Sequence, residues 1–336
     1  MPETLKIAIP MAGLGTRMRP HTWSKPKPLI ALAGKTVLDY LLEQFNTLSD
    51  PKNVEYIFIV GPNQRQQVEE HMQRFYPDKV VHYVIQEQMR GQSDALYLSR
   101  EFLRGPMLMT FSDTLIETDL SFLDQVDFDG LAWVKSVPDP RRFGVAVVNG
   151  QGWVTRLIEK PQEMGNNLAV VGFYYFHQAE RLLSAIEEQM QRNVTIKGEF
   201  FLADAINIML ETGARMKPRP VTVWMDAGMP EALLETNHYL LENGRDNSAE
   251  AARPGVAIIP PVFIHPSAII ENSVIGPYVS LGEECCLKQV IVRNSILDEG
   301  ADVESIVLEN SLLGRYVQVH GQANHLNLGD QSWAMS

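Results

Sequence analysis

The sequence is poor in the features that mark secreted or membrane proteins. Its two cysteines, Cys285 and Cys286, are adjacent, so they can neither cross-link the fold nor form a metal knuckle, and a reducing environment is expected. No stretch approaches the roughly 18 apolar residues that a membrane span needs. The short apolar run at 7–12 lacks the basic flank and the cleavage pattern of a signal peptide. These absences predict a cytoplasmic protein.

Basic side chains are outnumbered in this chain of 336 residues. Lysine and arginine total 29 against 41 aspartates and glutamates, which gives a net charge of −12 at pH 7. Proteins that bind nucleic acids or membrane surfaces need a basic footprint, so both classes are excluded as broad-surface partners. The length, with 45% hydrophobic residues, is typical of a globular protein with two domains.

Strands and helices alternate through the first two thirds of the chain. We predict strands at 5–10, 56–60, 80–86 and 107–112, with helical spacing at 37–48 and 68–75 between them. This alternation predicts parallel strands with crossover helices, hence an α/β fold. The later elements are predicted as paired strands at 131–137, 145–148, 153–158 and 168–176, helices at 178–192 and 201–212, a strand at 221–225 and a helix at 230–242.

Beyond residue 243 the pattern changes to a repeat. The polar segment 244–256 is predicted as a linker. Aliphatic residues then recur every four to six positions, at Ile264, Ile270, Ile275, Leu281, Leu287, Ile291, Leu297, Val303, Leu308, Leu313 and Val319. This spacing predicts a hexapeptide-type parallel β-helix in which each rung buries its aliphatic residue against the next. The domains are therefore predicted at 1–243 and 257–336, with the tail from Gln322 capping the last rung.

Acidic residues are absent between Thr4 and Leu38, although this segment holds six basic ones. Gly13 and Gly15 follow the first predicted strand, and glycines let backbone N–H groups approach phosphate oxygens. The third glycine of a dinucleotide-binding loop is missing, because Met18 stands at its position, and the GK[ST] of a Walker loop is missing too. Prolines stiffen the segment, so we expect a preorganised site for a small polyanion.

Seven motifs in order resemble those of sugar-1-phosphate nucleotidylyltransferases. They are Gly13-x-Gly-Thr-Arg17 with Pro26-Lys27-Pro28-Leu29, Gln86…Gly91…Ala95, Ser112-Asp113, Phe143-Gly144, Glu159-Lys160-Pro161, Leu168-Ala169-Val170-Val171-Gly172 and Trp224-Met225-Asp226-x-Gly228. The resemblance covers about residues 5–240 and is greatest to glucose-1-phosphate thymidylyltransferases of the long form. It implies a Rossmann-like mixed, mainly parallel sheet flanked by helices, followed by a short left-handed β-helix.

The resemblance implies transfer of a nucleotidyl group from a nucleoside triphosphate, with dTTP favoured, to a sugar 1-phosphate, with glucose 1-phosphate favoured, and release of pyrophosphate. The implied nucleotide-binding residues are Ala12, Gly13, Gly15, Thr16, Arg17, Lys27, Gln86 and Gly91. The implied sugar-phosphate-binding residues are Gly144, Glu159, Lys160, Val170 and Gly172. Lys25 is either a further phosphate contact or a solvated neighbour.

Asp113 and Asp226 are the carboxylates that the resemblance assigns to Mg²⁺. Each lies at the end of a predicted strand, where α/β folds bind ligands. Mg²⁺ prefers oxygen ligands and bridges phosphates, so two carboxylates are suited to hold it during the transfer of a nucleotidyl group. With Arg17 and Lys27 they form the predicted catalytic set.

The base and the sugar stay open. Ala12 stands where thymidylyltransferases usually have glycine, and the run 9–17 looks more like bacterial UTP–glucose-1-phosphate uridylyltransferases. Gln86 would read the base edge that thymine and uracil share. The alternatives are a uridylyltransferase acting on glucose- or N-acetylglucosamine-1-phosphate and a mannose-1-phosphate guanylyltransferase that uses GTP.

The β-helix leaves two further alternatives. An acyltransferase would need a histidine base, for which His265, His320 and His325 are the candidates. The preferred prediction is a scaffold for a homo-oligomer, formed through the β-helix or through sheet edges. A non-catalytic regulatory homologue would be expected to lack part of the catalytic set, all of which is present.

Overall fold

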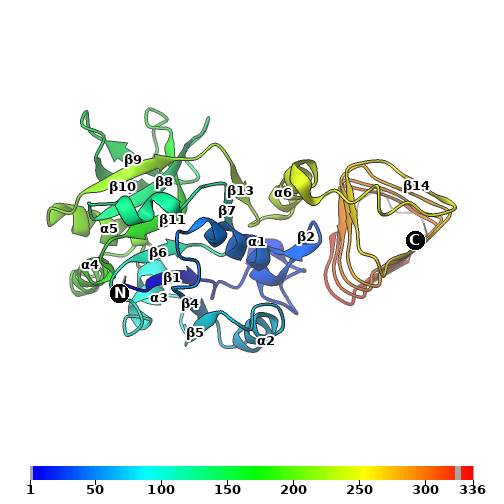
Figure 1. The fold of residues 1–336 in the computed structure, drawn as a ribbon, viewed down its shortest axis with the longest axis horizontal. Coiled ribbons are helices and arrows are strands. Elements are labelled where there is room, and N and C mark those ends of the chain that lie inside the picture. Colours follow the sequence, from blue (N-terminus) through cyan, green and yellow to red (C-terminus); the bar gives the residue numbers. More distant parts are fainter. Residues whose placement is uncertain (1–2, 322–326, 336) are drawn as a thin grey trace. The chain divides into compact units, whose positions relative to one another are not determined.

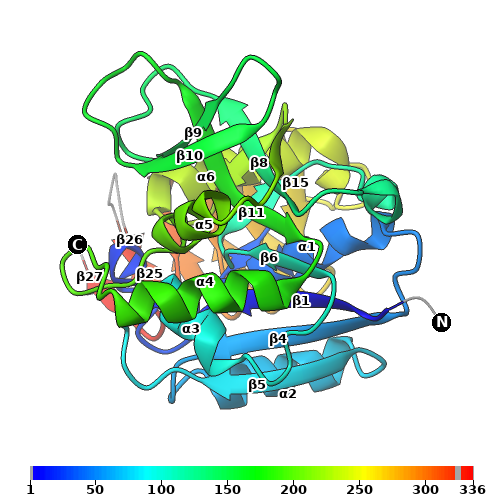
Figure 2. The same ribbon diagram turned by 90° about the vertical axis from the view of Figure 1, so that its left-hand side faces the viewer.

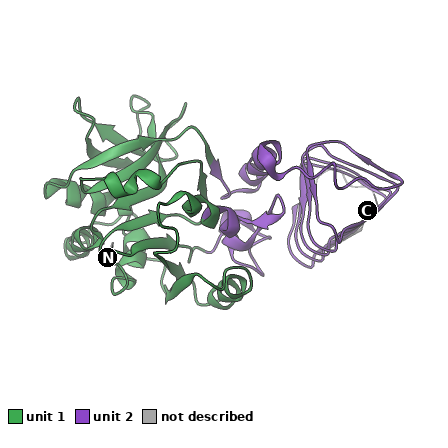
Figure 3. Cartoon of the chain, viewed as in Figure 1, with its two compact units in different colours: residues 1–13, 42–224 green, residues 14–41, 225–336 purple. Residues whose placement is uncertain are grey.

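The structure is a computed structural model that describes residues 3–321 and 327–335. The chain divides into two compact units, unit 1 with residues 1–13 and 42–224 and unit 2 with residues 14–41 and 225–336 (Figure 3). Unit 2 therefore combines a segment near the start of the chain with its last third. The domain boundaries predicted from the sequence follow a different division and stay a prediction. Among the described residues, no helix combines the length and the apolar character that crossing a membrane requires.

A nine-stranded sheet forms the centre of unit 1. Its strands follow the order β10 (Val154–Glu159), β9 (Gly144–Val148), β11 (Leu168–Phe176), β6 (Met107–Thr110), β1 (Leu5–Pro10), β4 (Val54–Val60) and β5 (Val80–Ile85), and β8 (Gly130–Ser136) joins β11 to β12 (Met216–Pro220). β6, β1, β4 and β5 are parallel neighbours, whereas the pairs around β11 and β9 are antiparallel. The predicted mixed α/β sheet is confirmed.

Helices cover this sheet because its strands alternate apolar side chains between two faces (Figure 2). One face meets α3 (Gln92–Leu98), α4 (Ala179–Gln191) and α5 (Leu202–Glu211), where Ile57, Ile186 and Ile206 belong to one core. Tyr56 points the other way and meets Phe45 of η3 (Gln44–Thr47), their ring centroids 6.0 Å apart. The predicted helix at 68–75 is α2 (Arg65–Phe75), and Val68 is fully buried.

The parallel strands of unit 1 carry their loops to one edge of the sheet. β1 leads to Gly13, β5 leads to Gln86 and β6 leads to Asp113. β11 runs the opposite way, with Phe173 opposite Thr110, so residues 168–172 lie at this same edge. Ligands of α/β sheets bind at the carboxyl ends of parallel strands, and this edge is therefore where a site is expected.

The C-terminal part of unit 2 is a parallel β-helix with three faces (Figure 1). The first face has β14 (Val256–Ile258), β17 (Ser273–Ile275), β20 (Ile291–Arg293) and β23 (Val307–Glu309). The second has β15 (Val262–Ile264), β18 (Val279–Leu281), β21 (Ser295–Leu297), β24 (Leu312–Leu313) and β26 (Asn327–Leu328). The third has β16 (Ile269–Glu271), β19 (Cys286–Lys288), β22 (Asp302–Glu304), β25 (Gln318–His320) and β27 (Trp333–Met335). The predicted β-helix is confirmed.

The aliphatic repeat forms the core of this β-helix, with one exception. Ten of the eleven predicted residues are buried, but Ile291 is 49% exposed, and its neighbour Val292 is fully buried instead. Ile291 pairs with the outward Val274, and Val292 pairs with the inward Ile275. The prediction for Ile291 is therefore wrong, because a one-residue change of phase moves a strand side chain to the other face.

Two other predictions differ in detail. Of the strand predicted at 221–225, only Trp224 and Met225 are in a strand, β13 (Trp224–Asp226), because residues 221–223 connect it to β12. The helix that follows is α6 (Pro230–Leu240), with η5 (Leu241–Arg245) directly after it. The tail does more than cap, since β26 and β27 extend the ladders of β24 and β25. Residues 322–326 of the predicted cap lie outside the described residues.

The predicted linker is bonded to the first rung of the β-helix. The Asn247 backbone N–H donates to the Val262 carbonyl oxygen at 2.9 Å, and its side chain accepts from the Ile264 N–H at 2.8 Å. Ala251 is buried in the β-helix core. A preceding rung would otherwise pair with the backbone groups of Val262 and Ile264. Asn247 bonds to them in its place, so this segment begins the β-helix.

Candidate active site

The segment 14–30 of unit 2, here called the basic loop, is a series of tight turns. Gly15 has a φ of +58°, and a Cβ at this position would lie 2.9 Å from Thr22 Cγ2. The Thr22 hydroxyl donates to the Gly15 carbonyl oxygen at 2.8 Å. In η1 (Thr16–Met18) the Met18 side chain is fully buried while Arg17 is exposed. The turn thus anchors the loop on Met18 and presents Arg17 to solvent.

Lys25 and Lys27 lie in different environments although only Pro26 separates them. Lys27 begins η2 (Lys27–Leu29) and is half-buried. The Lys25 side chain is only 5% exposed, and its ammonium forms an ion pair with Asp298 of the β-helix. Lys25 is therefore not a solvated side chain, and its buried ammonium is paired with Asp298 rather than open to a phosphate. Of the two lysines, only Lys27 retains access to solvent.

Gly13 lies in an open position in the loop that follows β1. The Met11 N–H continues the β1 ladder to the Ile59 carbonyl oxygen at 2.8 Å, and Ala12 is buried. A Cβ on Gly13 would meet no atom within 4 Å. Packing therefore does not require glycine here, and the backbone at Gly13 is open to close approach by a ligand.

Gln86 is buried directly after β5, and hydrogen bonds fix the orientation of its side-chain amide. Its Nε2 donates to the Gly91 carbonyl oxygen at 3.2 Å and to Asp94 Oδ2 at 3.0 Å. Both partners are acceptors, so they fix the orientation of the amide. Within the described residues Oε1 makes no hydrogen bond. Gln86 can therefore offer an acceptor, but no donor, to a ligand.

The backbone at Gly91 cannot carry a larger residue. Its φ is +103°, and a Cβ would lie 2.4 Å from the Phe200 carbonyl oxygen. Asp94, whose role the sequence analysis missed, accepts from the guanidinium of Arg90 and holds Gln86 at the same time. The sequence offered only the spacing of four between Arg90 and Asp94, and that spacing is not helical here, because Arg90 precedes Gly91, the N-cap of α3.

Asp113 lies half-buried in the turn between β6 and β7 (Thr114–Ile116). The Phe111 N–H donates to the Gly172 carbonyl oxygen at 3.2 Å, and the Thr114 hydroxyl donates to the Val171 carbonyl oxygen at 3.1 Å. Gly172 has a φ of +80°, and a Cβ there would lie 2.4 Å from the Phe111 ring. These contacts bring Asp113 and the start of β11 together in unit 1.

Glu159 and Lys160 end β10 opposite Gly144. Gly144 pairs with Glu159, and a Cβ on Gly144 would lie 3.1 Å from Glu159 Oε2. Val170 is buried one residue after Ala169, which pairs with Val145. Burial raises the pKa of Glu159, while the nearby Lys160 opposes that rise. Lys160 Nζ lies 4.0 Å from Glu159 Oε1 and is 62% exposed, so its charge faces solvent.

Asp226 belongs to unit 2 and is exposed at the end of β13. Its Oδ1 accepts from the Gly228 N–H at 2.6 Å, and its carbonyl oxygen accepts from the Thr236 hydroxyl at 3.0 Å. The turn before α6 thus fixes the backbone and one carboxylate oxygen. In residues 3–321 and 327–335 no group of three or more histidine, cysteine, aspartate or glutamate side chains could hold a metal by itself.

The predicted site residues are distributed over both units. Unit 1 holds Ala12, Gly13, Gln86, Gly91, Asp113, Gly144, Glu159, Lys160, Val170 and Gly172. Unit 2 holds Gly15, Thr16, Arg17, Lys27 and Asp226. Within unit 1 the structure gathers them at the carboxyl edge of the sheet, and within unit 2 it gathers the cations on one stiff loop. The fold and these groups define an α/β enzyme that handles phosphorylated ligands.

Comparison with known proteins gives the family. The family model for nucleotidyl transferases matches residues 8–243, and the chain belongs to that family. The chain is 29% identical to a glucose-1-phosphate thymidylyltransferase of Streptomyces griseus, over 98% of this chain and 99% of the relative. It is 31% identical to a low-salt glycan biosynthesis nucleotidyltransferase of Haloferax volcanii, over 93% and 92%. Enzymes of this family generally use a divalent metal ion.

A solved structure shares the fold. It comes from Bacillus anthracis and carries the provisional name glucose-1-phosphate thymidylyltransferase. The TM-score is 0.60 at 23% identity, covering 70% of this chain and 94% of that chain. The resemblance seen in the seven motifs is confirmed by these comparisons.

Proposed function

We propose that this protein joins the nucleotidyl group of dTTP to glucose 1-phosphate and releases pyrophosphate. One observation carries the proposal: the open Gly13 lies in the loop after β1, and the half-buried Asp113 lies in the turn after its parallel neighbour β6. A glycine that packing does not require, next to a carboxylate at the same sheet edge, supports a site for a phosphate and a metal ion. The substrates are inferred from the relative in Streptomyces griseus, which aligns with nearly the whole chain.

The residues of the chain supply charge and orientation for this reaction. Arg17 and Lys27 would neutralise the triphosphate, and Lys160 would bind the phosphate of the incoming sugar. Glu159 would accept hydrogen bonds from sugar hydroxyls, with Gly144, Val170 and Gly172 lining the pocket. The step needs two anions brought into line and no covalent enzyme intermediate, so positioning and charge neutralisation account for the catalysis.

A magnesium ion fits the two carboxylates that the chain offers. Asp113 and Asp226 would hold it, because Mg²⁺ commonly binds through one or two carboxylates and keeps phosphate oxygens and waters as its other ligands. When bound, the ion supplies positive charge to the phosphate oxygens.

Gln86 supports a base with an N–H donor on its pairing edge. The donors of its amide are occupied by Gly91 and Asp94, so only Oε1 remains for a ligand. Thymine and uracil carry N3–H and guanine carries N1–H, whereas cytosine and adenine present an unprotonated nitrogen at that edge. Cytosine and adenine carry an amino donor beside that nitrogen, so the single acceptor of Gln86 does not by itself choose among the triphosphates, and the relative in Streptomyces griseus is what favours dTTP.

The proposal extends to the assembly and the location of the protein. An outward ladder of Val274, Ile291 and Val307 runs up one face of the β-helix, and the last two are about half exposed. A second copy of the chain would bury this apolar surface, in a homo-oligomer. Cys285 and Cys286 are free thiols, as expected for a protein of the reducing cytoplasm.

An acyltransferase activity of the β-helix has no support in the described residues. His265 Nδ1 lies 2.8 Å from the Ser267 hydroxyl, and the Ser267 N–H points to the same nitrogen at 3.3 Å. His265 is therefore used in a turn. His320 lies 3.7 Å from Asp302 on an exposed face, and His325 lies outside the described residues.

A pyrophosphate-release assay tests the proposal. Five nucleoside triphosphates would be tested against glucose-, mannose- and N-acetylglucosamine-1-phosphate with Mg²⁺. We expect the highest turnover with dTTP and glucose 1-phosphate, and less with UTP. Asp113→Asn should lower turnover about 10²–10³-fold, as the loss of one group that stabilises charge does, whereas the exposed Asp119→Asn should leave it unchanged. Full turnover by Asp113→Asn would refute the site.

A further inference from the structure

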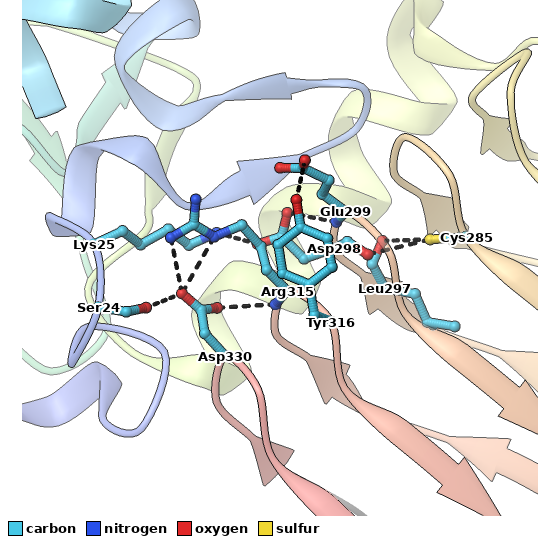
Figure 4. A network of polar contacts seen from close by, with 9 residues as sticks. All are labelled: Ser24, Lys25, Cys285, Leu297, Asp298, Glu299, Arg315, Tyr316 and Asp330. Carbon is cyan, nitrogen blue, oxygen red and sulfur yellow. Dashed lines mark hydrogen bonds and ion pairs between the residues drawn. The ribbon is translucent and has the colours of Figure 1, made fainter.

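The basic loop rests on the β-helix through polar side chains at its centre (Figure 4). Lys25 forms an ion pair with Asp298, and the Ser24 hydroxyl donates to Asp330. Pro20 lies against the backbone of Gly329, where a Cβ would be 2.6 Å from the proline Cβ. All of these contacts lie within unit 2 and join residues far apart in the sequence.

The hairpin that follows the loop is also fixed on unit 2. β2 (Ala31–Leu32) and β3 (Lys35–Thr36) are joined by Ala33 and Gly34, and a Cβ on Gly34 would lie 2.4 Å from the Phe263 ring. The Ala33 N–H donates to Asn237 Oδ1 at 3.2 Å. The loop segment between Pro20 and Gly34 is thus held at both ends as well as at its centre.

Asp298 is itself rigidly held at a corner of the β-helix. Its Oδ1 accepts from the Glu299 N–H at 2.8 Å, and its N–H donates to the Leu313 carbonyl oxygen at 2.9 Å. The buried thiol of Cys285 donates to the Asp298 carbonyl oxygen at 3.1 Å. Asp330 is held likewise, since Arg315 donates to it from its backbone N–H and its guanidinium.

We propose that Asp298 is a positioning residue for the triphosphate, acting through Lys25 on Lys27. The Lys25 and Asp298 side chains are 5% and 13% exposed, so each charge depends on the other for compensation. Lys27 is two residues from Lys25, across the rigid Pro26, and the position of Lys25 therefore sets where the Lys27 ammonium can reach. The β-helix thereby takes part in nucleotide binding without touching the nucleotide. This inference rests on the proposed function, because it assigns Lys27 to a phosphate.

The two partners differ in what their removal leaves behind. Asp298→Asn leaves the Lys25 ammonium buried without a counter-charge, so the loop must move to hydrate it. Lys25→Met leaves Asp298 with its hydrogen bond from Glu299. The double variant removes both charges and leaves no buried ion, so the loop can settle again. Rescue of Asp298→Asn by Lys25→Met is therefore the signature of a contact that acts through Lys25.

Steady-state kinetics of pyrophosphate release tests the inference. Asp298→Asn should raise KM for the triphosphate about tenfold, equivalent to about 1.4 kcal/mol, while KM for the sugar 1-phosphate stays at the wild-type value. Adding Lys25→Met should restore KM to within about threefold of wild type. The control Asp302→Asn, on an exposed part of the β-helix, should change neither KM. An unchanged KM in Asp298→Asn, or no rescue in the double variant, would overturn the inference.

Hydrogen exchange separates this inference from the proposed function. Amides of residues 16–30 should exchange faster in Asp298→Asn than in wild type or Asp302→Asn, whether or not a substrate is known. If wild-type protein released no pyrophosphate with any substrate pair, the proposed function would fail. Unchanged exchange in Asp298→Asn would then overturn the positioning contact, and faster exchange would support it.

Discussion

The basic loop of unit 2 and the β9–β11 edge of unit 1 are built in different ways. The loop has short 3₁₀ turns and rests on the β-helix through Lys25, Ser24 and a few close contacts. The β9–β11 edge is part of a sheet, and backbone ladders together with close packing at Gly172 fix it. Side-chain contacts can be lost one at a time, whereas a ladder yields as a whole. The loop should therefore respond to changes in the β-helix, and the edge should not.

Removing a charged side chain should give the largest effect, and the kinetic parameter that changes should differ between the loop and the edge. Lys27→Ala in the loop should lower kcat about 10²–10³-fold, because it removes charge at the reacting phosphate. Lys160→Ala at the edge should raise KM for the sugar 1-phosphate and lower kcat less. Both are measured by pyrophosphate release, with the exposed Arg19→Ala as the control for loss of charge alone. An equal loss of kcat in both lysine variants would remove the distinction between the regions.

Glycine substitutions should separate the two regions by stability. Gly172→Ala places a Cβ 2.4 Å from Phe111 at a φ of +80°, so we expect a loss of about 1–3 kcal/mol from backbone strain and overpacking together. Gly13→Ala meets nothing within 4 Å, so its free energy of unfolding should not change while its affinity for the triphosphate falls. Denaturant unfolding and nucleotide titration measure these effects. Unchanged nucleotide affinity in Gly13→Ala would contradict the role of Gly13.

The pH dependence of sugar binding should give the smallest effect. Burial raises the pKa of Glu159, so on acidification its carboxylate takes up a proton at a higher pH than an exposed glutamate does. KM for the sugar 1-phosphate should therefore rise as the pH falls through this raised pKa, while Glu159→Gln should show a flat profile. Because the folded state binds this proton more tightly, Glu159→Gln should also be more stable than wild type at pH 7, and the gain should vanish at low pH. KM for the triphosphate is the internal control, because the loop lacks this carboxylate.

Local periodicity predicted much of the fold. β1 and β11 have the predicted bounds, and ten of the eleven aliphatic residues of the repeat are buried. The predicted burial of Ile291 was wrong because the repeat shifts by one residue there, and a list of spacings cannot show which of two adjacent aliphatic residues points inward. The paired role of Asp94 was missed because it depends on Gln86 and Arg90 meeting in space.

The sequence by itself determined the two kinds of fold, the basic loop and the family, since strand and helix periods and turn-forming residues act over short distances. It could not decide between Lys25 and Lys27, which share one Lys-Pro-Lys-Pro run. Only the tertiary structure decided that Lys25 is buried against Asp298, at a separation of 273 residues, and that Lys27 is not. The physical reason is that a buried charge takes its partner from whatever the fold places beside it, and no local pattern records that partner.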